Sequence, residues 1–236
     1  QNLLFSATMP PDIKSLADEI LRDPVRVQIG HTAPAASVAH TFYPVATSSK
    51  DALLRKILDT TSTSAVLVFT RTKRRSKNLA RLLEESGYEA AALHGNLSQS
   101  NRRKAMDGFR SGRYKILVAT DVAARGIDVR GISHVINYDI PDTVDAYTHR
   151  IGRTGRLERT GDAFTFITRE DEDMVRSIER VLGGKVERRT LEGFDYKKPK
   201  PGQDAEFARS PRNPQPPSRR QRAAKGSVRR LFPAGI

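Results

Sequence analysis

Short runs of aliphatic and β-branched residues alternate along this chain with longer segments whose apolar residues recur at helical spacing. Uninterrupted apolar runs predict strands buried on both faces of a parallel sheet, because a half-exposed strand would alternate polar and apolar residues. Pro44 marks the edge or end of the first strand. The predicted strands are His40–Val45, Val66–Phe69, Ala90–Leu93, Lys115–Ala119, Val135–Tyr138 and Ala163–Ile167.

The intervening segments predict helices with one apolar face. Leu79, Leu82 and Leu83 form such a stripe, which we assign to core packing. Ser98 is placed to cap a helix, and Gly87 lies just beyond the end of another. The predicted helices are Lys50–Thr60, Lys73–Ser86, Ser98–Ser111, Val144–Gly152 and Glu170–Leu182.

Alternating strands and helices predict an α/β fold, a three-layer α/β/α sandwich with a mainly parallel sheet. Ligands of such sheets bind beyond the carboxyl ends of the strands. Arg71, His94, Gly95 and Thr120 follow three predicted strands. Asp121, next along, either joins them or only caps a helix. We therefore expect an anion-binding face here.

Residues 149–156 read His-Arg-Ile-Gly-Arg-Thr-Gly-Arg, three guanidiniums and an imidazole on about two predicted helical turns. Guanidinium forks match phosphate oxygens, and glycines let a bulky anion approach closely. This density favours a polyanion ligand. A solvated basic helix end is the alternative.

Composition narrows the class of protein. The 236 residues carry a net charge of +14 and no cysteine, which excludes disulfides and thiolate metal sites and indicates an acidic partner such as nucleic acid. No apolar stretch of about 18 residues occurs. We expect a cytoplasmic protein without a membrane partner.

Residues 195–236 differ from the rest of the chain. They hold 11 Lys and Arg against 3 Asp and Glu, or +8, and 7 of the 13 prolines. A segment rich in like charges and prolines cannot bury enough apolar surface to offset the conformational entropy that ordering would cost. We therefore expect a disordered basic tail. This tail either binds RNA or only keeps the chain soluble.

The chain resembles the DEAD-box RNA helicases over about residues 1–190, and the tail and residues 30–39 are most similar to the bacterial RhlE-like branch. Four features in the family's order and spacing carry the resemblance: Ser6-Ala7-Thr8, His94-Gly95 with Gln99 and Arg102, residues 120–128 (Thr-Asp-Val-Ala-Ala-Arg-Gly-Ile-Asp), and residues 149–156.

The resemblance implies two RecA-like lobes, of which this sequence holds the second. The phosphate-binding loop G-x-x-x-x-G-K-[ST] and the Asp-Glu-Ala-Asp motif are not found, so we interpret the chain as a fragment lacking most of the first lobe. Residues 1–30 would end the first lobe, with a helix Pro11–Leu21 that has proline in its first turn and a closing strand Val25–Ile29. Residues 31–39 would be the linker, residues 40–194 the C-terminal RecA-like domain and residues 195–236 the tail.

The resemblance also implies the residue roles. Arg153 and Arg156 would be catalytic arginine fingers that stabilise charge during phosphoryl transfer. ATP would contact these two and the pair Gly126 and Asp128, with Mg2+ held by the missing lobe and no metal ligand here. The residues expected to couple the lobes are Ser6, Thr8, Arg125 and His149. The residues expected to bind RNA are Arg71, His94, Gly95, Arg102 and Thr120.

We therefore expect the C-terminal lobe of an ATP-dependent RNA helicase that grips RNA backbone without sequence preference and separates short duplexes locally. Alone, it would not hydrolyse ATP. Expected partners are RNA, the first lobe, and proteins of ribosome assembly or RNA decay. The alternatives are a non-catalytic RNA-binding module and a lobe of a DNA translocase. For single residues, His94 is equally suited to packing, and Arg102 to a helix surface like its neighbours Arg103 and Lys104.

Overall fold

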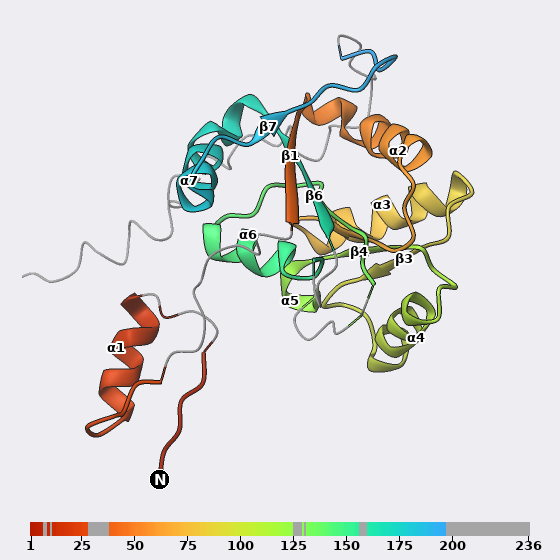
Figure 1. Ribbon diagram of the computed structural model, residues 1–236. Helices are drawn as coiled ribbons and strands as arrows, with labels where there is room; N and C mark the ends of the chain where they lie inside the picture. Colours follow the sequence, from red (N-terminus) through yellow and green to blue (C-terminus); the bar gives the residue numbers. More distant parts are fainter. Residues whose placement is uncertain are drawn as a thin grey trace, which may run out of the picture. The chain divides into compact units, whose positions relative to one another are not determined.

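The computed structural model describes residues 1–6, 9, 11–27, 38–124, 129, 131–155 and 160–196. Its centre is a seven-stranded sheet in the order β3-β4-β2-β5-β6-β1-β7, with parallel pairing between neighbours (Figure 1). The strands are β1 (Val38–Pro44), β2 (Val66–Phe69), β3 (Ala90–Leu93), β4 (Ile116–Ala119), β5 (His134–Asn137), β6 (Gly161–Ile167) and β7 (Glu187–Arg188).

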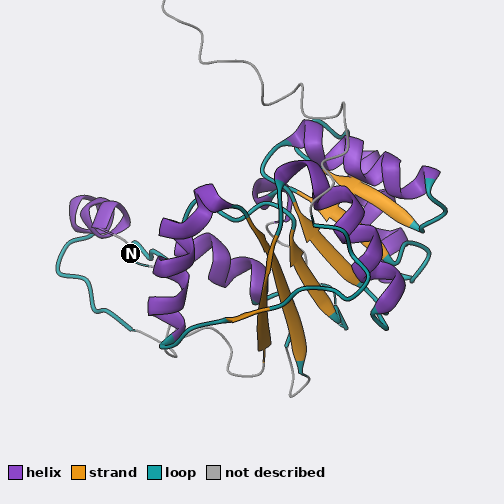
Figure 2. Cartoon of the chain, turned by 90° about the horizontal axis from the view of Figure 1, so that it is seen from above, coloured by secondary structure: helices purple, strands orange, loops and turns teal. Residues whose placement is uncertain are grey.

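Helices lie on both faces of the sheet (Figure 2). They are α2 (Lys50–Thr60), α3 (Lys73–Glu85), α4 (Gln99–Arg110), α5 (Asp121–Ala124), α6 (Val144–Ile151) and α7 (Glu172–Leu182), with short 3-10 turns at Thr47–Ser49 and Arg169–Asp171. A separate helix, α1, spans Pro11–Ile20.

Successive residues of the central strands point to opposite faces, and both faces are buried. In β2, Val66 and Val68 pack beneath α2 and α3, whereas Leu67 and Phe69 pack on the other face with residues of α4 and α5. A third apolar cluster holds residues of α6 and α7 against β1 and β6. This arrangement confirms the three-layer α/β/α prediction, and the uninterrupted apolar runs are its physical cause.

Local sequence signals set several helix ends. Ser98 caps α4 by accepting a hydrogen bond from the Asn101 amide at 3.2 Å, as predicted. Gly87 follows α3 with φ at +89°, a backbone region that glycine enters without penalty. The helix α2 matches its predicted bounds at both ends, and Pro44 is the last residue of β1.

Several predictions of local structure were wrong or incomplete. Residues 25–27 form no strand, and Val25 and Val27 are 90% and 79% exposed; residues 28–29 lie outside the described part. The strand β7 was missed because Glu187 and Arg188 are exposed polar residues without an apolar run. A helix after Thr120 was expected, with Asp121 as its possible cap, but the sequence did not give its bounds, which are Asp121–Ala124.

The two helical turns expected over residues 149–156 do not form. The helix α6 ends at Ile151, and residues 152–155 leave it as a turn. Gly152 follows as the C-terminal cap residue, and glycine at this position does not sustain a helix. The predicted tail, residues 195–236, is described only for Asp195 and Tyr196. Among the described residues, no helix is long and apolar enough to cross a membrane.

Candidate RNA and nucleotide interface

Three of the residues predicted to bind RNA follow neighbouring strands at one edge of the sheet. Gly95 comes after β3, Thr120 after β4 and Arg71 after β2, and these strands are adjacent in the order β3-β4-β2. Gly95 and Arg71 are exposed and Thr120 is half-buried. The Thr120 amide donates to the Leu93 carbonyl at 3.2 Å, which joins the ends of β4 and β3. The parallel topology therefore gathers these residues on one polar edge.

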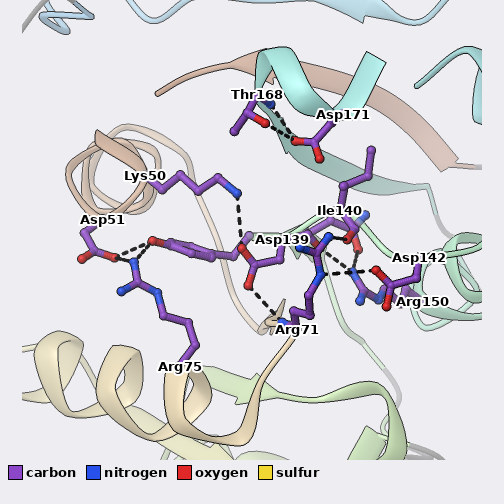
Figure 3. A network of polar contacts seen from close by, with 12 residues as sticks. Lys50, Asp51, Arg71, Arg75, Asp139, Ile140, Asp142, Arg150, Thr168 and Asp171 are labelled. Carbon is purple, nitrogen blue, oxygen red and sulfur yellow. Dashed lines mark hydrogen bonds and ion pairs between the residues drawn. The ribbon is translucent and has the colours of Figure 1, made fainter. Parts of the chain in front are cut away.

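The loop after β5 holds Arg71 in place. Asp139 accepts a hydrogen bond from the Arg71 amide at 2.9 Å through one carboxylate oxygen, and Lys50 Nζ lies 3.2 Å from the other. Figure 3 shows Lys50 and Arg71 approaching Asp139 from two sides. The Arg71 guanidinium reaches the Ile140 carbonyl at 3.3 Å and Asp142 at 3.3 Å. One loop thus orients the backbone and the side chain of a candidate RNA-binding residue.

A second buried network lies beside the first. The Tyr138 hydroxyl donates to Asp51 at 2.8 Å, and Arg75 contacts both groups. Desolvation raises the pKa of Tyr138 well above its ordinary value, so the hydroxyl stays protonated. This cluster ties the first turns of α2 and α3 to the end of β5, and we assign it to structure.

Arg150 is enclosed and not available to a polyanion. Its Nε and one terminal nitrogen meet both carboxylate oxygens of Asp121 at 2.6 and 2.8 Å, and its other terminal nitrogen donates to Asn137 and the Asp139 carbonyl at 3.1 and 2.7 Å. Its guanidinium carbon lies 5.0 Å from the centre of the Phe69 ring. One of the three guanidiniums that made residues 149–156 a candidate polyanion site is therefore paired within the protein.

Helix geometry explains this placement. Side chains on an α-helix tilt toward its N-terminus, so Arg150, near the end of α6, reaches back toward the carboxyl ends of β4 and β5. Asp121, which begins α5, binds Arg150 through its carboxylate and therefore does more than cap a helix. The ion pair joins the segment after Thr120 to the helix that precedes Arg153.

The turn that carries Arg153 packs tightly against the start of β6. Thr154 is buried, and its hydroxyl donates to the Ile132 carbonyl at 2.6 Å. A Cβ placed on Gly161 would lie 2.6 Å from the Gly155 amide nitrogen, a separation that real side chains do not tolerate. His149 is exposed and Arg153 half-buried. The packing of the turn therefore fixes the backbone position of Arg153, a residue whose guanidinium chemistry suits a polyphosphate.

His94 lies beneath the exposed Gly95. It is 7% exposed, and its Nδ1 is enclosed without a hydrogen-bond partner among the described residues. Desolvation, followed by the charges of Lys77 and Lys73, lowers the pKa of His94 below 6.5, so the ring is neutral near pH 7. A neutral, enclosed imidazole positions the loop and adds no positive charge to the edge.

Arg102 is half-buried and is not a freely solvated helix charge. One terminal nitrogen donates to the Ala123 carbonyl at 2.6 Å, which fastens α4 to α5. This contact brings Arg102 beside the residues that follow Thr120.

The structure describes only some of the remaining residues that were predicted to have a functional role. Ser6 is exposed, in the described segment 1–6. Five others lie outside the described residues: Thr8, Arg125, Gly126, Asp128 and Arg156. Within the described ranges, no group of three or more His, Cys, Asp or Glu side chains could hold a metal ion. Asp171, which begins an acidic run, instead accepts hydrogen bonds from the amide and hydroxyl of Thr168, both at 2.8 Å.

Sequence reasoning gave no supporting role to Lys50, Asp139 or Arg150, although Asp139 was noted at a strand end and Arg150 in the basic stretch 149–156. Asp139 had one usable signal, since it directly follows a buried strand. Lys50 gave none, because a lysine at the start of a helix is ordinarily solvated, whereas this one is 5% exposed.

The chain matches known proteins over this same region. Residues 49–158 match the family described as helicase conserved C-terminal domain. The chain is 44% identical over 189 residues to the DEAD-box ATP-dependent RNA helicase CshA of Bacillus licheniformis, covering 80% of this chain and 39% of that protein. It thus spans about two fifths of this curated relative. The RhlE-like branch stays a prediction.

Solved structures agree with this match. One is the E. coli DEAD-box protein SrmB bound to regulator of ribonuclease activity A, at 34% identity and a TM-score of 0.65, covering 70% of this chain and 98% of that chain. Another is S. cerevisiae Dbp5 bound to RNA and ADP BeF3, at 29% identity and a TM-score of 0.72, covering 78% of this chain and 50% of that chain. The chain belongs to the DEAD-box family of RNA helicases and carries its C-terminal, RecA-like domain.

Proposed function

We propose that this chain is the C-terminal lobe of an ATP-dependent RNA helicase that grips RNA backbone along the carboxyl edge of β3, β4 and β2. The observation that carries the proposal is the gathering of Gly95, Thr120 and Arg71 at this edge, with Arg102 fastened beside them. An exposed amide, a hydroxyl and guanidiniums are the groups that bind phosphate oxygens. Binding of this kind reads no sequence and weakens steeply with salt.

Nucleotide chemistry would occur on the other side of the Arg150–Asp121 ion pair. Arg153, on its packed turn, would supply positive charge to the phosphates of ATP, together with Arg156, Asp128 and Gly126 of the predicted set. Ser6, Thr8, Arg125 and His149 would couple this lobe to the first one. The magnesium ligands and the phosphate-binding loop are expected on the first lobe, so the chain alone would not turn over ATP.

The ligands bound in structures of related proteins support this proposal. Dbp5 is bound to RNA and ADP BeF3 in a structure similar to this chain, and SrmB is bound to a protein regulator. We infer that this chain binds RNA and an adenine nucleotide as Dbp5 does. Closure of the two lobes around both ligands would then separate a short duplex locally.

The test joins this chain to a first helicase lobe and measures RNA-stimulated ATP hydrolysis before and after Arg153→Ala. A transition-state role predicts that kcat falls about 10³-fold while the KM for ATP changes little. Arg81→Ala is the matched control, because Arg81 is an exposed residue of α3 that pairs with Glu85 at 3.6 Å on the helix surface. Unchanged turnover in the Arg153 variant would remove the assignment.

A further inference from the structure

A groove runs along the outer side of α4, next to the candidate RNA edge. It has a volume of about 490 Å³ and is lined by residues from both ends of the helix, among them Gln99, Arg102, Arg103, Met106, Asp107 and Arg110. At a rise of about 1.5 Å per residue, this 12-residue helix is about 18 Å long. A groove of this length and volume accommodates nucleotides.

The charge of the groove favours a polyanion. Three arginines line it against one acid, Asp107, which already lies 3.6 Å from Arg110. Arg103 and Arg110 are exposed, and Met106 is half-buried between them. Guanidiniums bind phosphates and also stack on bases, and a thioether packs well against an aromatic ring. The groove thus offers contacts for both parts of a nucleotide.

The groove is continuous with the proposed RNA edge. Arg102 lines the groove and also donates to the Ala123 carbonyl, three residues beyond Thr120. Gln99 begins α4 just after the loop that holds Gly95. Arg102 and Gln99 therefore link the groove to the edge that carries Gly95 and Thr120.

We propose that the α4 groove is a second binding segment for single-stranded RNA, in which Arg103 and Arg110 hold phosphates and Met106 packs against a base. The inference rests on the proposed function, since it extends the same strand. Arg103 is then a binding residue and not merely an exposed helix charge. Short RNA fills the edge alone, and longer RNA also fills the groove.

The test uses the full chain and a length series of oligouridylates, with affinity measured by fluorescence anisotropy at several salt concentrations. The double variant Arg103→Ala/Arg110→Ala should bind the shortest RNA as the wild type does and the longest about tenfold more weakly. The salt slope on the longest RNA should fall by about 1.4, at about 0.7 per lost phosphate contact on a single strand. Both arginines are exposed, so the fold should tolerate their removal.

Two further variants separate this inference from the proposed function. Arg102→Ala should weaken binding at every RNA length, and its failure to do so would count against the edge itself. Arg81→Ala removes an exposed arginine from α3 and should change nothing. If the double variant matches the wild type on long RNA, or loses affinity equally at all lengths, the groove proposal is wrong even where the edge holds.

Discussion

Asp121 binds Arg150 through both carboxylate oxygens, although the two residues differ sharply in exposure. The Arg150 side chain is 3% exposed and that of Asp121 43%. The guanidinium therefore depends on the carboxylate for its charge balance, whereas water also reaches the carboxylate. This pair connects the segment after Thr120, on the proposed RNA side, to the helix that leads to Arg153, on the proposed nucleotide side.

The unequal exposure predicts unequal costs of mutation. Asp121→Ala leaves a buried guanidinium without a counter-charge and should lower the free energy of unfolding by about 3 kcal/mol. Arg150→Met leaves a carboxylate that water can solvate and should cost about 1 to 2 kcal/mol. Urea unfolding of both variants checks the order. Equal costs, or a larger cost for Arg150→Met, would contradict the burial argument.

Gly161→Ala should disturb the turn that carries Arg153. The added methyl would meet the Thr154 side chain and the Gly155 amide nitrogen, the latter at 2.6 Å, and backbone cannot rotate away as a flexible side chain does. We expect a loss of about 1 to 3 kcal/mol in unfolding free energy. Gly95→Ala is the control, because a Cβ there meets nothing within 4 Å. A stable Gly161→Ala protein would show that the turn is loosely packed.

Under the proposed function, Asp142 would compete with RNA for the Arg71 guanidinium. The two side chains lie 3.3 Å apart and are both substantially exposed, so a phosphate must displace or share the carboxylate. Asp142→Asn should therefore strengthen RNA binding by up to about fivefold, the range of an exposed ion pair. Anisotropy measured at low salt checks this, and the gain should vanish in the Arg71→Ala background. A gain that persists without Arg71 would indicate a general charge effect.

Stability should fall as the solution is acidified below neutral pH. Burial lowers the pKa of His40, His94 and His134 in the folded chain below the ordinary 6.5. Between the folded and unfolded pKa values the unfolded chain binds more protons, so their contribution is complete above about pH 7.5 and is lost as the pH falls through 6.5 toward the folded pKa values.

The slope reaches about 1.4 kcal/mol per pH unit for each histidine that is protonated only on unfolding. Urea unfolding midpoints measured from about pH 8 to about pH 5.5 check this slope. That pH range lies above the one in which ordinary carboxylates titrate. His134→Asn should reduce the slope, since His134 is buried beside Phe164 and its Nδ1 lies 2.9 Å from Ser133. Midpoints that stay constant with pH would contradict this account.

The sequence by itself determined the elements and their layers. Apolar runs such as Val66–Phe69 predicted strands buried on both faces, and α2 was predicted to the residue, because periodicity and capping act within a few neighbouring residues. The edge that holds Arg71, Gly95 and Thr120 was also predictable, since parallel strands end on the same side. The apolar residues of 25–27 show the limit, as their hydrophobicity alone did not produce a strand.

Only the tertiary structure decided which polar groups meet. Arg150 lies in the same basic stretch as Arg153, yet it forms an ion pair with Asp121, 29 residues away in the sequence. Lys50 likewise binds Asp139, which is 89 residues away. These pairings depend on the strand order and on the direction of helix side chains, which no local pattern encodes.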